Sequence, residues 1–385
     1  MKSIFLNKFT LLTTFLIPLI FILWFSQPAY TSKTPNQSNL IKIQTTKGEN
    51  IFPLGLYHVS HRLTAQQRLD ALRDIAAAGF NVIHAGCSNL DDYNKFLDEA
   101  ERLGVYAIVE FNEVDYRIVV KKFANKAAVL GWNIADDAGD HKTKAQILDM
   151  HRQIKAIDPR HYTYVSVSNW SKKWAEFADA GDLIGGQSYP IGYPFKNQPK
   201  GLPNTLIEVS HVFNIAQKEA TKHNRPVIAN LQVFKWDNQR LPTSKEVYNM
   251  TYQSLLSGVK GILFFAYDDG GKNQIYANEK LWDRLKSLAT EINKLSPVLR
   301  EGTLTKLDTK NKQLLAGQWR YRNNLYIIVV NTSSSQTIAT SMAIPIKKGL
   351  VKTLFPGHPS GMNLRNGNLS GSVKPEDVHI YQISK

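Results

Sequence analysis

Strand-like and helix-like stretches alternate eight times between residues 49 and 299, and this alternation constrains the fold more than any other feature. Each short apolar run is followed by a segment with apolar residues at helical spacing. Eight such pairs in about 250 residues are typical of a (β/α)8 barrel. A doubly wound open sheet is the main alternative, but no glycine-rich turn follows the first run. The predicted strands are 52–57, 80–84, 105–110, 129–135, 162–167, 183–187, 226–232 and 261–267.

The pattern changes beyond Pro297, where the last predicted helix, 278–295, is expected to stop because proline lacks the N–H that a helix interior needs. Short β-rich runs at 314–320, 326–331 and 378–383 follow, separated by turn residues such as Asn366 and Gly367. No helical period accompanies them. Residues 300–385 are therefore predicted to form a small all-β sandwich.

The N-terminus has the layout of an export signal. Lys2 and Lys8 precede an apolar run over 9–25, and residues 26–32 are small and polar. We expect residues 1–32 to be a cleaved leader or, because the run approaches the length of a spanning helix, a single N-terminal membrane anchor. A polar linker is expected over 33–48. The protein is thus expected to be extracellular, periplasmic or attached to the cell surface.

The chain is basic, with a formal net charge of +15, and the excess is concentrated at the C-terminal end. Residues 302–385 contain eleven Lys and Arg against three Asp and Glu, a net charge of +8. No compact basic run or nucleic-acid motif accompanies this excess, so nucleic acid is not an expected partner. The charge is equally consistent with attraction to an anionic cell-wall or membrane surface and with a merely solubilising surface.

Residues 127–140, AAVLGWNIADDAGD, join a predicted strand directly to two adjacent carboxylates, Asp136 and Asp137. The carboxyl ends of barrel strands form the face at which such proteins place their active sites. Aspartate is also a good helix N-cap, so this pair alone is equally consistent with a structural role before the next helix.

Carboxylates and aromatic rings dominate the other residues that follow the predicted strands. This mixture suits sugars, whose C–H faces stack on aromatic rings and whose hydroxyls need carboxylate and amide partners. Cleaving a glycosidic bond requires one protonated carboxyl and a second carboxylate that attacks or activates water. We expect Asp137 to be the proton donor, and the catalytic candidates are Asp137, Asp136, Glu110, Asp268 and Asp269, the last two also being plausible caps. The substrate-binding candidates are Trp132, Tyr189, Gln232, Trp236, Tyr267 and His58.

The sequence predicts no metal site and no bound cofactor. His58 and His61 are spaced as HVSH, which does not match the alternation of side chains along a strand. No Walker loop, dinucleotide fingerprint or Gly-x-Ser-x-Gly elbow is present. Cys87, the only cysteine, is expected to be a buried structural thiol and cannot form an intrachain disulfide.

Three segments together resemble bacterial glycoside-hydrolase-like proteins of the clan A type: GWNIADDA at 131–138, residues 240–270 and residues 316–333. The resemblance spans nearly all of the chain after the leader and implies a (β/α)8 barrel followed by a β-sandwich. In that clan the fourth strand ends in Asn-Glu or Asp-Glu, commonly followed by Pro, and the Glu is the acid/base. Asp136 and Asp137 occupy those two positions, and Ala138 replaces the Pro.

The clan also places a nucleophilic glutamate at the end of the seventh strand, where this chain has only Gln232. An amide cannot act as that nucleophile, so the standard retaining mechanism does not carry over. Three hypotheses follow. The first is an exported glycosidase that acts on an oligosaccharide or polysaccharide, and the second is a non-catalytic glycan-binding or polysaccharide-processing accessory protein on the same barrel. The third, a metal-dependent hydrolase, needs a clustered set of ligands that cannot be assembled from the sequence.

Overall fold

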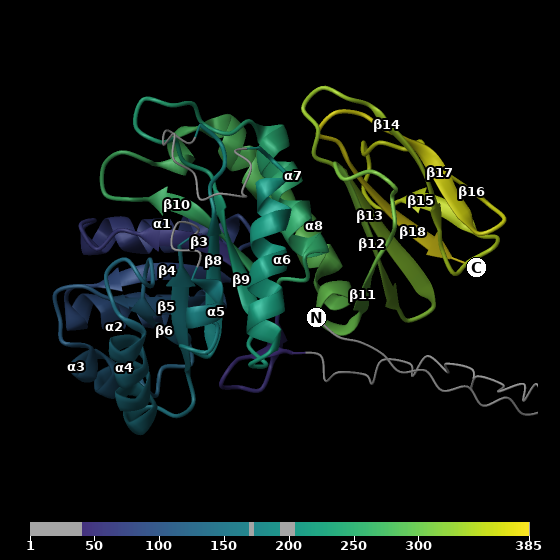
Figure 1. Ribbon diagram of the computed structural model, residues 1–385. Helices are drawn as coiled ribbons and strands as arrows, with labels where there is room; N and C mark the ends of the chain where they lie inside the picture. Colours follow the sequence, from purple (N-terminus) through teal and green to yellow (C-terminus); the bar gives the residue numbers. More distant parts are fainter. Residues whose placement is uncertain (1–40, 169–172, 193–204, 385) are drawn as a thin grey trace, which may run out of the picture. The chain divides into compact units, whose positions relative to one another are not determined.

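The computed structural model describes residues 41–168, 173–192 and 205–384, and a closed parallel barrel is its central feature (Figure 1). The strands close in the order β10-β3-β4-β5-β6-β7-β8-β9. The predicted (β/α)8 barrel is confirmed, and the strands over 129–135 and 162–167 have the predicted bounds. The strands are β3 (Leu54–Val59), β4 (Val82–Cys87), β5 (Tyr106–Phe111), β6 (Val129–Ala135), β7 (Tyr162–Val167), β8 (Leu183–Ser188), β9 (Val227–Gln232) and β10 (Gly261–Asp268).

The barrel strands are apolar at their N-terminal ends and polar toward their C-terminal ends. A buried cluster at the N-terminal end includes Ile43, Val82, Ile108, Leu130, Leu183, Ile228 and Leu263. Further along the strands, the buried residues include the polar side chains of His84, Asn133, Ser166, Gln187 and Asn230. Burying polar groups costs free energy unless they are hydrogen-bonded. Their concentration at the C-terminal end of the barrel therefore indicates a functional site there.

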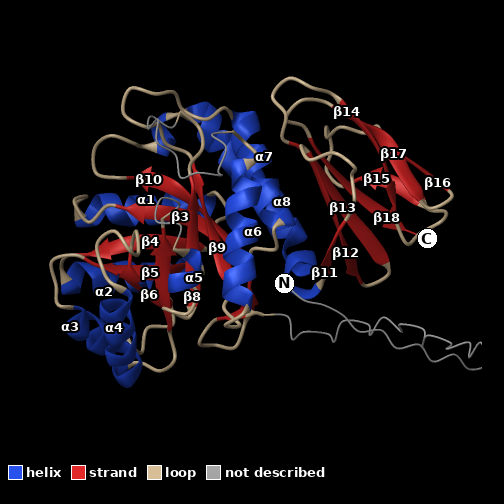
Figure 2. Cartoon of the chain, in the orientation of Figure 1, coloured by secondary structure: helices blue, strands red, loops and turns tan. Residues whose placement is uncertain are grey.

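Helices follow the strands and surround the barrel (Figure 2). Thr64, Thr143 and Thr243 each form a capping box with the residue three positions on, which fixes where the helices α1, α4 and α7 begin. The helices are α1 (Ala65–Ala77), α2 (Leu90–Leu103), α3 (Tyr116–Phe123), α4 (Lys144–Ile157), α5 (Trp174–Phe177), α6 (Glu208–Thr221), α7 (Ser244–Leu256), the 3-10 turn η1 (Ile275–Ala277) and α8 (Glu279–Glu301).

The C-terminal region is an all-β domain of two antiparallel sheets, as predicted. One sheet has the order β11-β12-β13-β18-β15 and the other β14-β17-β16, and Leu325, Ile327, Met342 and Leu369 belong to the buried cluster they share. The strands are β11 (Thr303–Lys306), β12 (Leu314–Tyr321), β13 (Asn324–Asn331), β14 (Ile338–Ala343), β15 (Leu350–Thr353), β16 (Asn363–Arg365), β17 (Asn368–Val373) and β18 (Val378–Ser384).

Helix α8 continues through Pro297 to Glu301, so the expectation that it ends before this proline is wrong. Val298 and Leu299 on its last turns are buried in a core that also contains Trp319 and Ile328 of the larger sheet. Burial of those side chains offsets the missing proline N–H. The barrel and the sandwich therefore share one core.

Two short strands lie before the barrel, the first of them within the predicted linker over 33–48. Strand β1 (Ile43–Gln44) pairs with β2 (Asn50–Ile51), and Ile43 is buried in the cluster at the N-terminal end of the barrel. The part of the linker before residue 41 and the predicted leader at 1–32 lie outside the described residues. Among the described residues, none of the helices has the length and apolar character needed to cross a membrane.

Candidate active site

Three carboxyl groups lie at the ends of two neighbouring strands. Glu110 lies near the end of β5, and Asp136 and Asp137 follow β6, which pairs with β5. Asp136 is held firmly: its Oδ1 accepts hydrogen bonds from Tyr57 Oη at 2.8 Å and from the Asp137 backbone N–H at 3.2 Å. This anchoring makes Asp136 a positioning residue rather than a group that is available to a ligand.

Gln187 at the end of β8 connects the two aspartates to a strand two places further around the barrel. Its Nε2 donates to Asp137 Oδ1 at 2.7 Å and also lies 3.3 Å from Asp136 Oδ1 and 3.0 Å from Ser166 Oγ. Asn230 continues this network, because its Nδ2 donates to Ser166 Oγ at 3.2 Å. The amide hydrogen bond favours the charged form of Asp137 and fixes its orientation.

Burial makes each of the three carboxyls hold its proton more tightly than usual. Burial and the nearby charge of Asp136 raise the pKa of Glu110 to about 7. The same two causes raise the pKa of Asp137 to about 6, although Gln187 opposes them. Burial also raises the pKa of Asp136. Perturbed carboxyls gathered at the C-terminal end of a barrel are a mark of acid/base sites.

Three described residues at this end have backbone conformations that L-amino acids rarely adopt. His58 has a φ of 63°, Asp137 a φ of 47° and Asp237, in the loop after β9, a φ of 26°. Such a conformation costs of order 1 kcal/mol and persists only where the surrounding structure imposes it. His58 and Asp137 are among the site residues predicted from the sequence, whereas Asp237 is not.

An aromatic wall, Tyr189, Phe234, Trp236 and Phe265, lies beside the polar network. The Tyr189 ring is 5.1 Å from Phe234 and 5.8 Å from Phe265, and Phe234 is 4.8 Å from Trp236. Trp236 Nε1 donates to the Tyr189 carbonyl at 3.3 Å, which ties the loop after β9 to the end of β8. Tyr189, Trp236 and Phe265 are partly exposed, so their rings are accessible to a ligand.

Asp268, the last residue of β10, and Asp269, which follows it, have a structural role. Asp268 is buried, and its carboxylate accepts from the Gly270 N–H, Gln274 Nε2 and Tyr276 Oη. Asp269 Oδ1 accepts the backbone N–H groups of residues 271, 272 and 273. Burial opposes ionisation of Asp269, but hydrogen bonds from Asn273 and its neighbours outweigh that effect and lower its pKa. These carboxylates close a turn, the capping role that the sequence left open.

Three predicted sugar-binding residues are buried and committed to partners within the protein. Trp132 is fully buried behind the barrel, where it stacks on Phe111 and donates to Asp158 Oδ2 at 2.9 Å. Tyr267 donates to Asp74 Oδ2 at 2.8 Å and packs against Trp282. Gln232 is buried, and its amide is bonded to the backbone of Ile191 and Phe234. Side chains alternate across a strand, so position near its end does not decide which face a residue takes.

A cluster of potential metal ligands includes a residue that sequence reasoning missed. His58, His84 and Glu110 each offer one ligand atom, and the three atoms lie within 4.8 Å of one another. His84 stacks on Tyr57, with ring centroids 4.0 Å apart. His84, Tyr57 and Gln187 were not predicted from the sequence, because each lies within an apolar stretch typical of a buried strand. The sequence feature that could have identified His84 and Gln187 is a His or Gln that interrupts such a stretch near its end.

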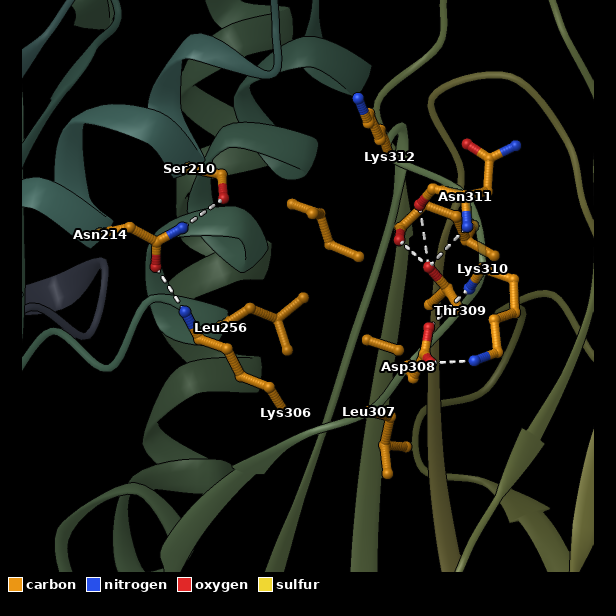
Figure 3. Close-up of a pocket in the computed structure, with 13 residues that line it drawn as sticks. Ser210, Asn214, Leu256, Lys306, Leu307, Asp308, Thr309, Lys310, Asn311 and Lys312 are labelled. Carbon is orange, nitrogen blue, oxygen red and sulfur yellow. Dashed lines mark hydrogen bonds and ion pairs between the residues drawn. The ribbon is translucent and has the colours of Figure 1, made fainter. Parts of the chain in front are cut away.

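A pocket of about 370 Å³ lies elsewhere, between α6 and the β11–β12 connection (Figure 3). Lys306 extends to Asn214 Oδ1, and Lys310 pairs with Asp308. None of the candidate site residues lines it. It is therefore not the candidate active site.

No protein-family model and no curated protein matches the sequence, but solved structures match the fold. A glycoside hydrolase aligns with a TM-score of 0.63 and 16% identity over 88% of this chain and 93% of its own. A glycoside hydrolase of family 5 from Bacteroides vulgatus aligns with a TM-score of 0.61 and 14% identity, covering 88% and 90%. AmyP in complex with maltose aligns with a TM-score of 0.55 and 11% identity, covering 89% and 95%. The chain therefore has a glycoside-hydrolase-like (β/α)8 fold followed by an all-β domain.

Proposed function

We propose that this protein is a glycoside hydrolase-like enzyme that cleaves an oligosaccharide or polysaccharide at the C-terminal end of its barrel. The observation that carries the proposal is the pair of partly buried carboxyls, Glu110 and Asp137, whose pKa values are raised to about 7 and about 6. The aromatic wall supplies partly exposed rings for sugar faces. A structural neighbour solved with maltose supports a carbohydrate as the ligand.

The hydrogen bonds favour roles opposite to those expected from the sequence. Asp137 accepts from Gln187, which stabilises its anion, and Asn112 has the same effect on Glu110, but Glu110 Oε2 has no hydrogen-bond partner among the described residues and burial raises the pKa of Glu110 further, to about 7. Glu110 is therefore the better proton donor, and Asp137 the better base or nucleophile. Glu110 would pass its proton to the glycosidic oxygen as the bond to the anomeric carbon breaks. Asp137 would attack that carbon or take a proton from the attacking water.

This pair replaces the one that spans strands four and seven in clan A enzymes. The corresponding seventh strand, β9, ends at Gln232, whose amide is committed to the backbone of Ile191 and Phe234. Asp268 and Asp269 are likewise committed to their turn. Among the described residues, Glu110 and Asp137 remain as the catalytic candidates, and Asp136 accepts the backbone N–H of Asp137 and so helps to hold it in place.

The donor role of Glu110 can be tested by changing the leaving group. The full chain and its Glu110→Gln and Asp137→Asn variants are incubated with maltotriose and a panel of α- and β-linked oligosaccharides. The aryl glycosides of any sugar that is cleaved are then compared. An aryl leaving group needs no proton, so Glu110→Gln should lose about 10²- to 10⁴-fold on the oligosaccharide and much less on a dinitrophenyl glycoside. Asp137→Asn should lose activity on both.

Equal losses by Glu110→Gln on both substrates would remove the donor assignment. Saturable binding of an oligosaccharide that is recovered intact by every form of the protein would instead support a non-catalytic binding protein.

We also propose that the protein is exported, on the strength of the basic, apolar and then small-residue order of residues 1–32. Fractionation of cells that produce the full chain should place it outside the cytoplasm. N-terminal sequencing then distinguishes a cleaved leader from a retained anchor. Recovery of the intact chain in the cytoplasmic fraction alone would contradict export.

A further inference from the structure

The side chains of His58, His84 and Glu110 converge from three consecutive barrel strands, β3, β4 and β5. One ligand atom from each residue lies within 4.8 Å of the others, and His58 Nδ1 is 3.6 Å from Glu110 Oε2. In a tetrahedral zinc site with bonds of about 2.1 Å, ligand atoms are about 3.4 Å apart. Small side-chain rotations would bring the three atoms to that spacing.

Two atoms of this cluster are buried without a partner among the described residues. They are Nδ1 of His84, a residue with 0% exposure, and Oε2 of Glu110. Polar atoms buried in a protein are nearly always bonded, so each such atom calls for an explanation. A shared cation would satisfy both at once.

Asn133 supplies the outer support that a metal-bound imidazole needs. Its Nδ2 lies 2.9 Å from His84 Nε2, and its Oδ1 is also buried without a partner among the described residues. A half-turn of this amide would let Oδ1 accept a hydrogen bond from Nε2–H. That arrangement would leave the Nδ1 lone pair for a metal and satisfy the Asn133 oxygen.

We propose that His58, His84 and Glu110 form a binding site for a divalent transition-metal ion of the Zn²⁺ class. Two imidazoles and one carboxylate are a ligand set that zinc uses in sites with an open fourth position. The two imidazoles select such ions against Mg²⁺ and Ca²⁺, which prefer oxygen ligands. His58 has a φ of 63°, in the left-handed region, and this strained backbone conformation sets the direction of its side chain near the end of β3.

One consequence rests on the proposed function. A Glu110 carboxylate bound to a metal cannot hold a proton for a leaving group, so the ion would inhibit glycoside cleavage. The binding test below uses no glycan, and its outcome is therefore independent of whether cleavage occurs.

The test is calorimetric titration of the full chain, without an affinity tag and after dialysis against a chelator, with ZnCl₂ and separately with MgCl₂. We expect one equivalent of zinc to bind and no saturable uptake of magnesium. Binding of Co²⁺ should give the strong visible bands of a low-coordinate ion with nitrogen ligands. His58→Ala and Glu110→Gln should each raise the zinc Kd at least about tenfold.

His61→Ala is the matched control, because His61 lies three residues from His58 but outside the cluster. It should bind zinc like the unmodified chain. Circular dichroism melts of every variant show whether it is folded before its Kd is compared. Failure of the folded, unmodified chain to bind zinc would overturn the proposal. So would a His58→Ala variant that keeps full affinity, or a His61→Ala variant that loses as much.

Discussion

Two pairs of adjacent aspartates follow strands of the same barrel, yet their surroundings are opposite. Asp268 and Asp269 after β10 receive hydrogen bonds from backbone N–H groups and side chains of their own turn. Asp137 after β6 receives one from Gln187, a residue 50 positions away, and lies close to the charge of Asp136. The carboxylates of Asp268 and Asp269 therefore accept their hydrogen bonds from the local turn. Asp137 is held instead by a residue of another strand and can still accept hydrogen bonds from a ligand.

The pKa values express the same difference. Local N–H groups lower the pKa of Asp269 despite its burial. Burial and a like charge raise the pKa of Asp137 to about 6. A carboxyl that is stabilised as an anion serves structure, and one that is poised near neutrality serves proton transfer.

The largest expected effect separates the two pairs by activity. Asp137→Asn should lower turnover of a cleaved glycan by about 10²- to 10⁴-fold, because the amide can neither attack nor act as a base. Asp269→Asn should stay within about threefold of the unmodified chain, because the turn is not part of the proposed chemistry. Initial rates of product formation check both. A large loss in Asp269→Asn with an unchanged melting temperature would contradict the comparison.

The next effect is on stability and should fall on the other pair. In Asp268→Asn, an amide NH₂ replaces one carboxylate oxygen. Where it takes the place of Oδ2, which now accepts from both Gln274 and Tyr276, these two donors lose their acceptor. We expect a loss of about 2 kcal/mol in the free energy of unfolding. Urea denaturation followed by tryptophan fluorescence measures it. An unchanged unfolding midpoint would mean that the turn does not depend on this carboxylate.

A smaller effect has opposite signs in the two pairs. The folded-state pKa of Asp137 lies above its ordinary value, so its contribution to stability falls as the pH rises from about 4 to about 6. Asp137→Asn should therefore raise the free energy of unfolding by about 1 kcal/mol at pH 8 and leave it unchanged near pH 4. Denaturant titrations at both pH values check this.

Asp269 has a lowered pKa, so its stabilising contribution is present above its ordinary pKa and is lost as the pH falls through the folded-state value. Asp269→Asn should lower the free energy of unfolding by about 1 kcal/mol at pH 7. If Asp137→Asn and Asp269→Asn changed the free energy of unfolding in the same direction at neutral pH, the proposed difference between the two pairs would be wrong.

The architecture was predictable because its signals are local. Apolar stretches, threonine capping boxes and the change of pattern after Pro297 specify the barrel and the sandwich without knowledge of any distant contact. The exception is α8, where packing of Val298 and Leu299 against the sandwich overrides the local preference of Pro297. Tertiary burial of this kind cannot be read from a proline alone.

The site was only partly predictable because it depends on which face of each strand a residue takes. Glu110 and the Asp136–Asp137 pair were predicted as candidates because carboxylates are conspicuous at strand ends. Trp132 and Tyr267 were misplaced because each packs on the outer side of the barrel. His84 and Gln187 were missed because a single polar residue within a buried strand resembles a satisfied core residue until its partners across the barrel are known.

The smallest effect extends the comparison from carboxylates to aromatic rings. Trp236 is partly exposed beside Tyr189, whereas Tyr267 is buried against Trp282 and bonded to Asp74. Trp236→Ala should raise KM for an oligosaccharide about threefold, because one stacking surface for a sugar ring is lost. Tyr267→Phe should leave KM unchanged and instead lower the melting temperature, because the Asp74 carboxylate loses its donor. If Tyr267→Phe changed KM and Trp236→Ala did not, the sugar would have to lie on the β10 side of the barrel, and the aromatic wall would lose its assigned role.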